Sequence, residues 1–226
     1  MNNDQISVTN VKDTTKLYSI KKIIYLFFKR TFDILISIVG LIPLIILAII
    51  VKIAYISSGD FNSIFYKHKR IGKKGVEFNL YKFRTMVPNS AEILEELLKD
   101  PEYKKEWREN HKFEHDPRVT KMGKILRVTS LDELPQILNI LNGTMSLIGP
   151  RPLIEEEVRD YKKDKDKLLS VKPGLTGWWA VNGRSCTSNK QRMKLELYYV
   201  DHQGFKLDIK IFFMTFVKVL KREGAK

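Results

Sequence analysis

ILISIVGLIPLIILAIIV, residues 34–51, is the stretch that decides the fold, because it runs for 18 residues without a charge. Only Ser37, Gly40 and Pro43 interrupt its apolar side chains. A straight helix of this length measures about 27 Å, close to the roughly 30 Å hydrocarbon thickness of a bilayer. The run starts well inside the chain and no small-residue cleavage site follows it. It therefore indicates a membrane segment rather than a signal peptide.

The middle of this segment and its flanks predict how it meets the membrane. Pro43 removes a helical hydrogen bond at the centre, so we expect a bend there. Basic residues stand on both sides: Lys16, Lys21, Lys22, Lys29 and Arg30 before it, and Lys67, Lys69, Arg70, Lys73 and Lys74 after it. Since Lys and Arg favour the cytoplasmic side, both flanks favour the same face. We expect a re-entrant helix, with a single span as the alternative.

Composition limits the partners. The chain has 226 residues, enough for one domain with a sizeable core plus an appendage. With 40 Lys and Arg against 26 Asp and Glu, its formal charge of +14 favours nucleic acid, anionic lipid or phosphorylated substrates. The single cysteine, Cys186, excludes an intramolecular disulfide framework and a cysteine-based zinc site, and it fits a reducing compartment.

The rest of the chain reads as a small hairpin followed by helices. Residues 61–66 and 76–83 have strand patterns and are joined around Gly72 and Gly75. Helical patterns cover residues 89–110 with an interruption at Pro101, and residues 121–128, 133–141, 153–165, 189–200 and 206–221. The last of these is apolar at its centre and basic at both ends. That pattern favours a helix lying in the membrane interface, with a buried core helix as the alternative.

RVTSLDELPQ, residues 127–136, carries the strongest chemical signal. Ser130 and Glu133 have the spacing of a capping box, which would start a helix at Ser130. Pro135 is tolerated only in a first turn, so the alternative is a helix that begins near Asp132. At such a start, backbone N–H groups would keep the Asp132 carboxylate ionised and attract phosphates.

Asp132 and Glu133 are expected to have different roles. Neighbouring side chains on a helix point about 100° apart, so the two acids do not address one atom in the same way. An ionised aspartate can attack phosphorus and form an acyl phosphate, a covalent intermediate. Glu133 would then hold a metal or assist the second acceptor. A simple helix start is the alternative reading of the pair.

Two later segments offer phosphate-binding arginines. Arg151 stands between Pro150 and Pro152, which constrain its backbone and suit its guanidinium to bidentate phosphate binding. A rigid loop with a solvated arginine is the alternative. In KPGLTGWWAVNGR, residues 172–184, turns frame two tryptophans that stack on a base, lie at headgroup level or pack in the core. Arg184 follows the second turn and could meet a phosphate.

Taken in order, these motifs resemble the bacterial sugar transferase family, the monotopic polyprenyl-phosphate phosphoglycosyl transferases that begin the assembly of capsule, O-antigen and other surface glycans. The resemblance covers about residue 29 to the C-terminus. It rests on KRTFDI before the membrane segment, YKFRTM (81–86), DPRVT (116–120), TSLDELPQ, MSLIGPRP, KPGLTGW and VNGR. One such string would be weak, whereas the ordered set is highly specific.

The resemblance implies an α+β fold. We expect a mostly helical, membrane-associated domain with a re-entrant N-terminal helix bent at Pro43, a small β-hairpin and interfacial amphipathic helices. Residues 1–28 would form an N-terminal segment, 29–56 the re-entrant membrane helix, and 57–226 the cytosolic catalytic domain. The protein would lie in the bacterial cytoplasmic (inner) membrane, with the catalytic domain on the cytoplasmic face.

The resemblance also implies a reaction. A sugar-1-phosphate would pass from a UDP-sugar to polyprenyl (undecaprenyl) phosphate through an aspartyl-phosphosugar on Asp132, with release of UMP. Glu133 would assist and would hold Mg²⁺, the expected cofactor. The residues at matching positions that would bind substrate or phosphate are Lys82, Arg127, Pro150, Arg151, Pro152, Arg184 and Asp208, although a helix-surface aspartate is an alternative for the last.

Three departures from the family pattern are visible. Ile42-Pro43 stands where Ser-Pro is common, and GWWAVNGR stands where many members read GWAQVNGR. We also expect a minimal form, without the N-terminal multi-span region of larger members. A membrane-anchored nucleic-acid-binding protein is disfavoured because no recognised motif is visible, so we expect no nucleic acid partner. A non-catalytic scaffold is the other alternative. The sugar stays open, and a homodimer is compatible with the sequence.

Overall fold

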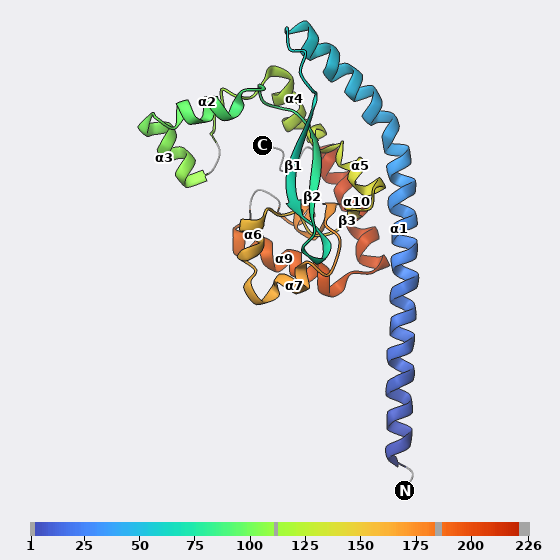
Figure 1. Ribbon diagram of the computed structural model, residues 1–226. Coiled ribbons are helices and arrows are strands. Elements are labelled where there is room, and N and C mark those ends of the chain that lie inside the picture. Colours follow the sequence, from blue (N-terminus) through green and yellow to red (C-terminus); the bar gives the residue numbers. More distant parts are fainter. Residues whose placement is uncertain (1–2, 111–112, 184–186, 222–226) are drawn as a thin grey trace.

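The fold is α+β and mostly helical, with one helix far longer than the rest. The computed structural model describes residues 3–110, 113–183 and 187–221. Helix α1 (Asn3–Ser57) runs straight past the side of the domain and then curves over its top (Figure 1). Pro43 lies inside this helix, which is continuous across it.

The remaining elements follow in chain order. They are β1 (Phe65–Ile71), the 3₁₀ turn η1 (Lys73–Gly75), β2 (Glu77–Phe83), α2 (Ser90–Leu97), α3 (Pro101–Asn110), α4 (Lys121–Thr129), η2 (Leu131–Glu133), α5 (Gln136–Leu141), β3 (Ser146–Ile148), α6 (Glu155–Arg159), η3 (Lys162–Asp164), α7 (Lys165–Leu168), β4 (Gly174–Thr176), α8 (Trp178–Val181), α9 (Asn189–His202) and α10 (Phe205–Lys221). The pair α2 and α3, separated at Pro101 as predicted, projects away from the domain (Figure 1).

The predicted hairpin is present, but its first strand was misplaced. Strands β1 and β2 pair antiparallel from Phe65↔Phe83 to Ile71↔Glu77, so β1 occupies residues 65–71 rather than 61–66. The sequence FYKHKRI hides this strand because its basic side chains interrupt the apolar alternation. Pairing with β2, which buries Phe78 and Leu80, decides the register.

A second, parallel pair of strands was not predicted. Strands β3 and β4 pair through Ser146↔Gly174 and Ile148↔Thr176. Each has three residues, too short to show a period of two. A Cβ atom on Gly174 would collide with the backbone nitrogen of Gly149, so glycine is required there. This close approach joins the Pro150–Pro152 loop to the segment that carries the tryptophans.

Several helix boundaries differ from the prediction. The helix expected at residues 153–165 is broken into α6, η3 and α7, and Lys162 has a positive φ of 47° that no continuous helix accepts. The helix expected at residues 133–141 begins at Gln136, after the separate turn η2. Helices α4, α9 and α10 were predicted correctly to within two residues.

Helix α1 presents one face to the domain along most of its apolar length. Its buried side chains recur at helical spacing: Tyr25, Asp33, Ser37, Leu44, Val51 and Tyr55. The opposite face exposes isoleucines, leucines, valines and phenylalanines from Ile20 to Ile56. Residues 20–57 are long and apolar enough to cross a membrane, and only 17% of their most apolar window is buried. The exposed face therefore requires an apolar environment.

Three charged side chains of the KRTFDI motif dock α1 on the domain. Lys29 forms an ion pair of 2.7 Å with Asp208 of α10. The Arg30 guanidinium donates to the carbonyl oxygens of Ile140 (2.6 Å) and Leu141 (3.0 Å), at the C-terminal end of α5. Asp33 is buried and its Oδ1 accepts from the Leu147 backbone N–H (2.8 Å) and from the Ser146 hydroxyl (3.1 Å).

We predict that Asp33→Ala lowers the free energy of unfolding by more than about 2 kcal/mol, because it leaves two donors of β3 unpaired beneath α1. Ser37 is the matched control, since its buried hydroxyl has no hydrogen-bond partner in the described part of the chain. Ser37→Ala is expected to be neutral or slightly stabilising. Thermal unfolding in detergent compares the two variants. An equal loss in both would show that burial, and not the Asp33 hydrogen bonds, stabilises this contact.

Candidate active site

The two predicted acids meet one lysine. Lys82 of β2 lies 2.8 Å from Glu133 Oε1 and 3.5 Å from Asp132 Oδ2. Both acids belong to η2, a single turn between α4 and α5. Ser130 adopts the left-handed conformation (φ 56°, ψ 17°) that ends α4 and starts this turn. The capping box predicted for Ser130 and Glu133 is therefore wrong, because an N-cap residue needs an extended backbone.

The environment of Asp132 also differs from the prediction. Helix α5 begins only at Gln136, so Asp132 does not lie in its first turn. Burial raises the pKa of Asp132, the Lys82 ammonium lowers this pKa, and the Glu133 carboxylate raises it again. Burial outweighs the favourable charge of Lys82. A carboxylate with a raised pKa is a more basic nucleophile once it is ionised.

Arg127 completes the cationic side of this turn. Its Nε donates to the Thr85 hydroxyl at 3.0 Å, which fixes the guanidinium beside the end of β2. The charge of Arg127 lowers the pKa of Asp132. Lys82 and Arg127, both predicted as phosphate contacts, therefore act electrostatically on the same carboxylate.

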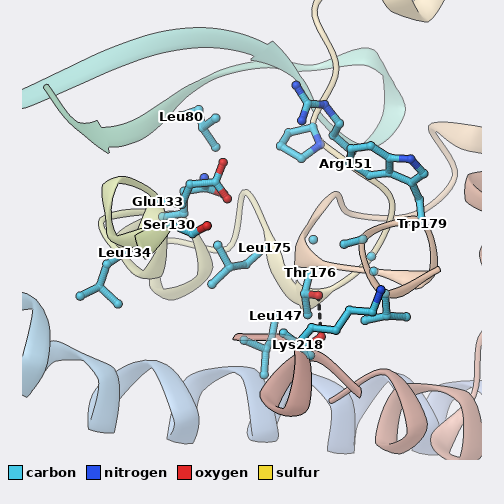
Figure 2. Close-up of a pocket in the computed structure, with 18 of the residues that line it drawn as sticks. Leu80, Ser130, Glu133, Leu134, Leu147, Arg151, Leu175, Thr176, Trp179 and Lys218 are labelled. Atoms are coloured by element: carbon cyan, nitrogen blue, oxygen red, sulfur yellow. Dashed lines mark hydrogen bonds between the residues drawn. The ribbon is translucent and has the colours of Figure 1, made fainter. Parts of the chain in front are cut away.

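A cavity of about 360 Å³ opens beside the acids (Figure 2). Its lining combines charged groups with an apolar majority: Arg70, Leu80, Lys82, Ser130, Leu131, Glu133, Leu134, Gln136, Leu147, Gly149, Arg151, Pro152, Gly174, Leu175, Thr176, Gly177, Trp179, Ala180, Val181, Glu196, Phe212, Thr215, Phe216 and Lys218. Asp132 is not in this lining, but its neighbours Lys82 and Glu133 are. Four cationic and two acidic side chains thus line a space of ligand size at the site the sequence singled out.

Arg151 is held at the far side of the cavity from Glu133 (Figure 2). The carbonyl oxygen of Pro150 accepts from the Gly174 backbone N–H at 2.8 Å, which ties the Pro-Arg-Pro loop to β4. The Arg151 guanidinium carbon lies 5.5 Å from the centre of the Trp179 ring. The buried Nε of Arg151 has no hydrogen-bond partner among the residues that the structure describes. This guanidinium is pinned and still has capacity to bind an anion.

Glu196 of α9 is a site residue that the sequence analysis missed. Its Oε2 accepts from the Arg151 backbone N–H at 3.1 Å, while within the described ranges its buried Oε1 has no partner. Burial raises the pKa of Glu196 to about 7. The available signal was a glutamate flanked by apolar side chains in KLELYYV. The buried Glu196 carboxylate therefore positions the backbone of Arg151.

Glu157 of α6 joins two further arginines behind the same loop. Its carboxylate lies 3.5 Å from Arg70 and 3.0 Å from Arg192. Burial lowers the pKa of Arg70, and the charge of Arg151 lowers it further. The cavity lining thus includes the guanidinium groups of Arg70 and Arg151, whose positive charge attracts phosphates.

We predict that Glu196→Gln reduces the pH dependence of stability. A carboxyl whose pKa rises from 4.5 unfolded to about 7 folded contributes stability below about pH 4.5 that is lost as the pH rises through 7. The shift corresponds to about 3 kcal/mol. The amide stays neutral and still accepts from Arg151. Thermal unfolding at pH 5 and pH 8 should differ less in Glu196→Gln than in wild type or in Glu156→Gln, an exposed control. A larger difference in Glu196→Gln would contradict this assignment.

The two predicted tryptophans have different surroundings. Arg184 and Cys186 are outside the described residues. Trp178 stacks on Tyr198 with ring centres 5.4 Å apart, whereas Trp179 lines the cavity and donates from Nε1 to the Thr187 hydroxyl at 2.7 Å. Trp178 therefore packs against a neighbouring ring, whereas Trp179 forms part of the cavity wall.

Asp208 lies in a buried joint between α1, α9 and α10, not on the helix surface and not in the cavity lining. Its Oδ2 accepts from the Tyr25 hydroxyl (2.9 Å) and from Lys29 (2.7 Å). Its Oδ1 accepts from the Tyr199 hydroxyl at 2.8 Å. These contacts indicate that Asp208 anchors α1.

Asp132 and Glu133 suit a Mg²⁺ site that also uses substrate oxygens, but they do not form a complete metal site by themselves. Within the described ranges, no group of three or more His, Cys, Asp or Glu side chains could hold a metal ion. Mg²⁺ is usually bound through one or two carboxylates together with substrate phosphates and water. Asp132 and Glu133 are adjacent oxygen donors beside the cavity, so they fit this mode.

Comparison with known proteins gives concordant matches. The family model described as bacterial sugar transferase matches residues 24–222. The chain is 45% identical over 200 residues to the UDP-galactose-lipid carrier transferase of Erwinia amylovora, covering 88% of this chain and 42% of that protein. With the same coverage, it is 44% identical to the undecaprenyl-phosphate galactose phosphotransferase of Salmonella typhimurium. It is 42% identical over 198 residues to the exopolysaccharide production protein ExoY of Sinorhizobium fredii, covering 87% of both. The chain thus spans less than half the length of the first two relatives and most of the third.

Proposed function

This chain belongs to the bacterial sugar transferase family, and we propose that it transfers a sugar-1-phosphate from a UDP-sugar to undecaprenyl phosphate, which initiates synthesis of a surface glycan. The observation that carries the proposal is the Asp132–Glu133 pair bridged by Lys82 at the edge of a basic cavity. The names of two relatives refer to galactose, so UDP-galactose is the first donor to test.

The proposed reaction has two displacements at one phosphorus. An oxygen of Asp132 attacks the phosphorus that carries the sugar, and the bond to the bridging oxygen breaks, so that UMP leaves with its electron pair. An oxygen of undecaprenyl phosphate then attacks the same phosphorus and breaks the acyl phosphate bond, which regenerates the Asp132 carboxylate. Splitting the transfer in this way conserves the energy of the broken pyrophosphate bond in the intermediate.

The surrounding residues stabilise charge in this scheme. Lys82 and Arg127 lower the cost of ionising Asp132, and Lys82 with Arg151 faces the phosphates in the cavity. Glu133, together with donor phosphate oxygens, would hold Mg²⁺, which when bound supplies further positive charge to the phosphates. Glu196 holds the backbone of Arg151, so that its guanidinium meets the donor in one orientation.

We predict that purified protein with Mg²⁺ and undecaprenyl phosphate releases UMP from one sugar in a UDP-sugar panel. Asp132→Asn should reduce this release by about 10³-fold or more, because the amide cannot act as nucleophile. Asp166→Asn, the same change at an exposed aspartate, serves as control and should release UMP at the wild-type rate. No UMP from a folded protein across the whole panel would refute the proposal and favour a non-catalytic scaffold.

We further propose that α1 enters and leaves the cytoplasmic membrane by its cytoplasmic face. Residues 20–57 form a helix of about 57 Å, nearly twice the hydrocarbon thickness of a bilayer. Tyr25 and Tyr55, buried on the same domain, are separated by about 45 Å of helix. A helix that contacts one water-soluble domain over this length cannot also cross to the opposite side within the contact. The exposed apolar face of α10 would lie in the same interface.

We predict that both ends of α1 react from one side of the membrane. Single cysteines at Lys16 and Ser58, in a Cys186→Ser background, would be probed with a membrane-impermeant maleimide. Both should be labelled in inverted vesicles and protected in intact cells with a sealed inner membrane. Labelling of the two positions from opposite sides would establish a spanning helix.

A further inference from the structure

The floor of the cavity is formed by the helix that also carries an exposed apolar face. Phe212, Thr215, Phe216 and Lys218 of α10 line the cavity, and α10 lies beneath Leu147 and Thr176 (Figure 2). A hydrogen bond of 2.7 Å between the Thr176 and Thr215 hydroxyls joins this floor to β4. The floor therefore has a fixed position relative to the Pro-Arg-Pro loop.

The apolar outer surface of α10 reaches the cavity at Phe216. Ile209, Phe213, Phe216 and Val217 are exposed, and their spacing places them on one side of the helix. Phe216 is 62% exposed and also lines the cavity. An isoprenoid chain in contact with the outer face of α10 would thus reach the cavity at Phe216.

Lys218 is a cation on this floor that no described carboxylate neutralises. Arg70 pairs with Glu157, and Lys82 pairs with Asp132 and Glu133. Lys218 forms no ion pair within the described residues. Its side chain extends along the floor below Thr176, towards the side of Trp179 and away from Glu133 (Figure 2). An ammonium group without a neighbouring carboxylate gains more from an arriving phosphate than one that is already paired.

We propose that Lys218 binds the phosphate of the polyprenyl acceptor as it enters from the membrane side, while Phe212 and Phe216 contact its first isoprenoid units. This proposal rests on the proposed function, because it assigns different parts of that one site to the donor and the acceptor phosphates. The donor phosphates lie between Lys82, beside the acidic pair, and Arg151, on the opposite wall, and the acceptor phosphate arrives over α10. Lys218 is thus a specificity residue for the second displacement.

Equilibrium binding tests this division without requiring turnover. The affinities of the protein for undecaprenyl phosphate and for UMP would be measured in zwitterionic nanodiscs, which contain no anionic phospholipid. We expect Lys218→Gln to weaken undecaprenyl phosphate binding by about 10-fold, the effect of one charge-assisted hydrogen bond, and UMP binding by a smaller factor. The matched control is Lys210→Gln on the same helix, whose ammonium lies 5.2 Å from the centre of the Trp178 ring and not in the cavity lining. It should retain wild-type affinity for the acceptor.

Three results would overturn the proposal: unchanged acceptor affinity in Lys218→Gln, an equal loss in Lys210→Gln, or a loss of UMP affinity as large as that for the acceptor. The first shows no contact, the second a general charge effect, and the third a donor contact. Failure of the proposed function has a different signature, because wild type would then bind no UMP. A selective loss of undecaprenyl phosphate binding in Lys218→Gln would still support the acceptor site.

Discussion

The docking of the charged turn of α1 on the domain is the interaction on which the rest of the structure depends. Lys29, Arg30 and Asp33 each contact a different element, namely α10, the end of α5 and β3. Each of these three elements supplies residues to the floor or the walls of the cavity. Because α1 also presents a long exposed apolar face, the same docking sets the height and orientation of the cavity relative to an apolar phase. An error of one helical turn here would change the height of the acidic pair relative to that apolar phase.

Within the domain, the proposed chemistry depends on which cations at the cavity form no ion pair among the described residues. Lys82 is shared by Asp132 and Glu133, and Glu157 is shared by Arg70 and Arg192. Burial raises the pKa of Asp132 and the adjacent Lys82 lowers it, and burial has the larger effect. Among the residues that the structure describes, the guanidinium of Arg151 and the ammonium of Lys218 form no ion pair. In the proposed reaction, Arg151 would bind the donor phosphates and Lys218 the acceptor phosphate.

Local patterns predicted the parts of the fold that local physics controls. The apolar segment, the hairpin, the break at Pro101 and helices α4, α9 and α10 follow from periodicity and from turn residues. The start of β1 did not, because FYKHKRI becomes a strand only through pairing with β2. The parallel pair β3–β4 depends on a contact between Gly149 and Gly174 that sequence spacing does not reveal. Among candidate site residues, motifs singled out Lys82, Asp132, Glu133 and Arg151, which the structure brings to one cavity or its edge. Glu196 was missed and Asp208 was placed with the substrate contacts, because their surroundings come from helices distant in sequence.

The central claim is that Asp132 becomes covalently bonded to the transferred group, and intact-protein mass spectrometry tests it most directly. Protein incubated with Mg²⁺ and its UDP-sugar, without acceptor, should gain the mass of one sugar phosphate. The added mass should map to the peptide containing Asp132, be absent from Asp132→Asn, and disappear on addition of undecaprenyl phosphate. An unmodified protein under these conditions, in a preparation that turns over once acceptor is added, would contradict the account and show direct transfer between the two substrates.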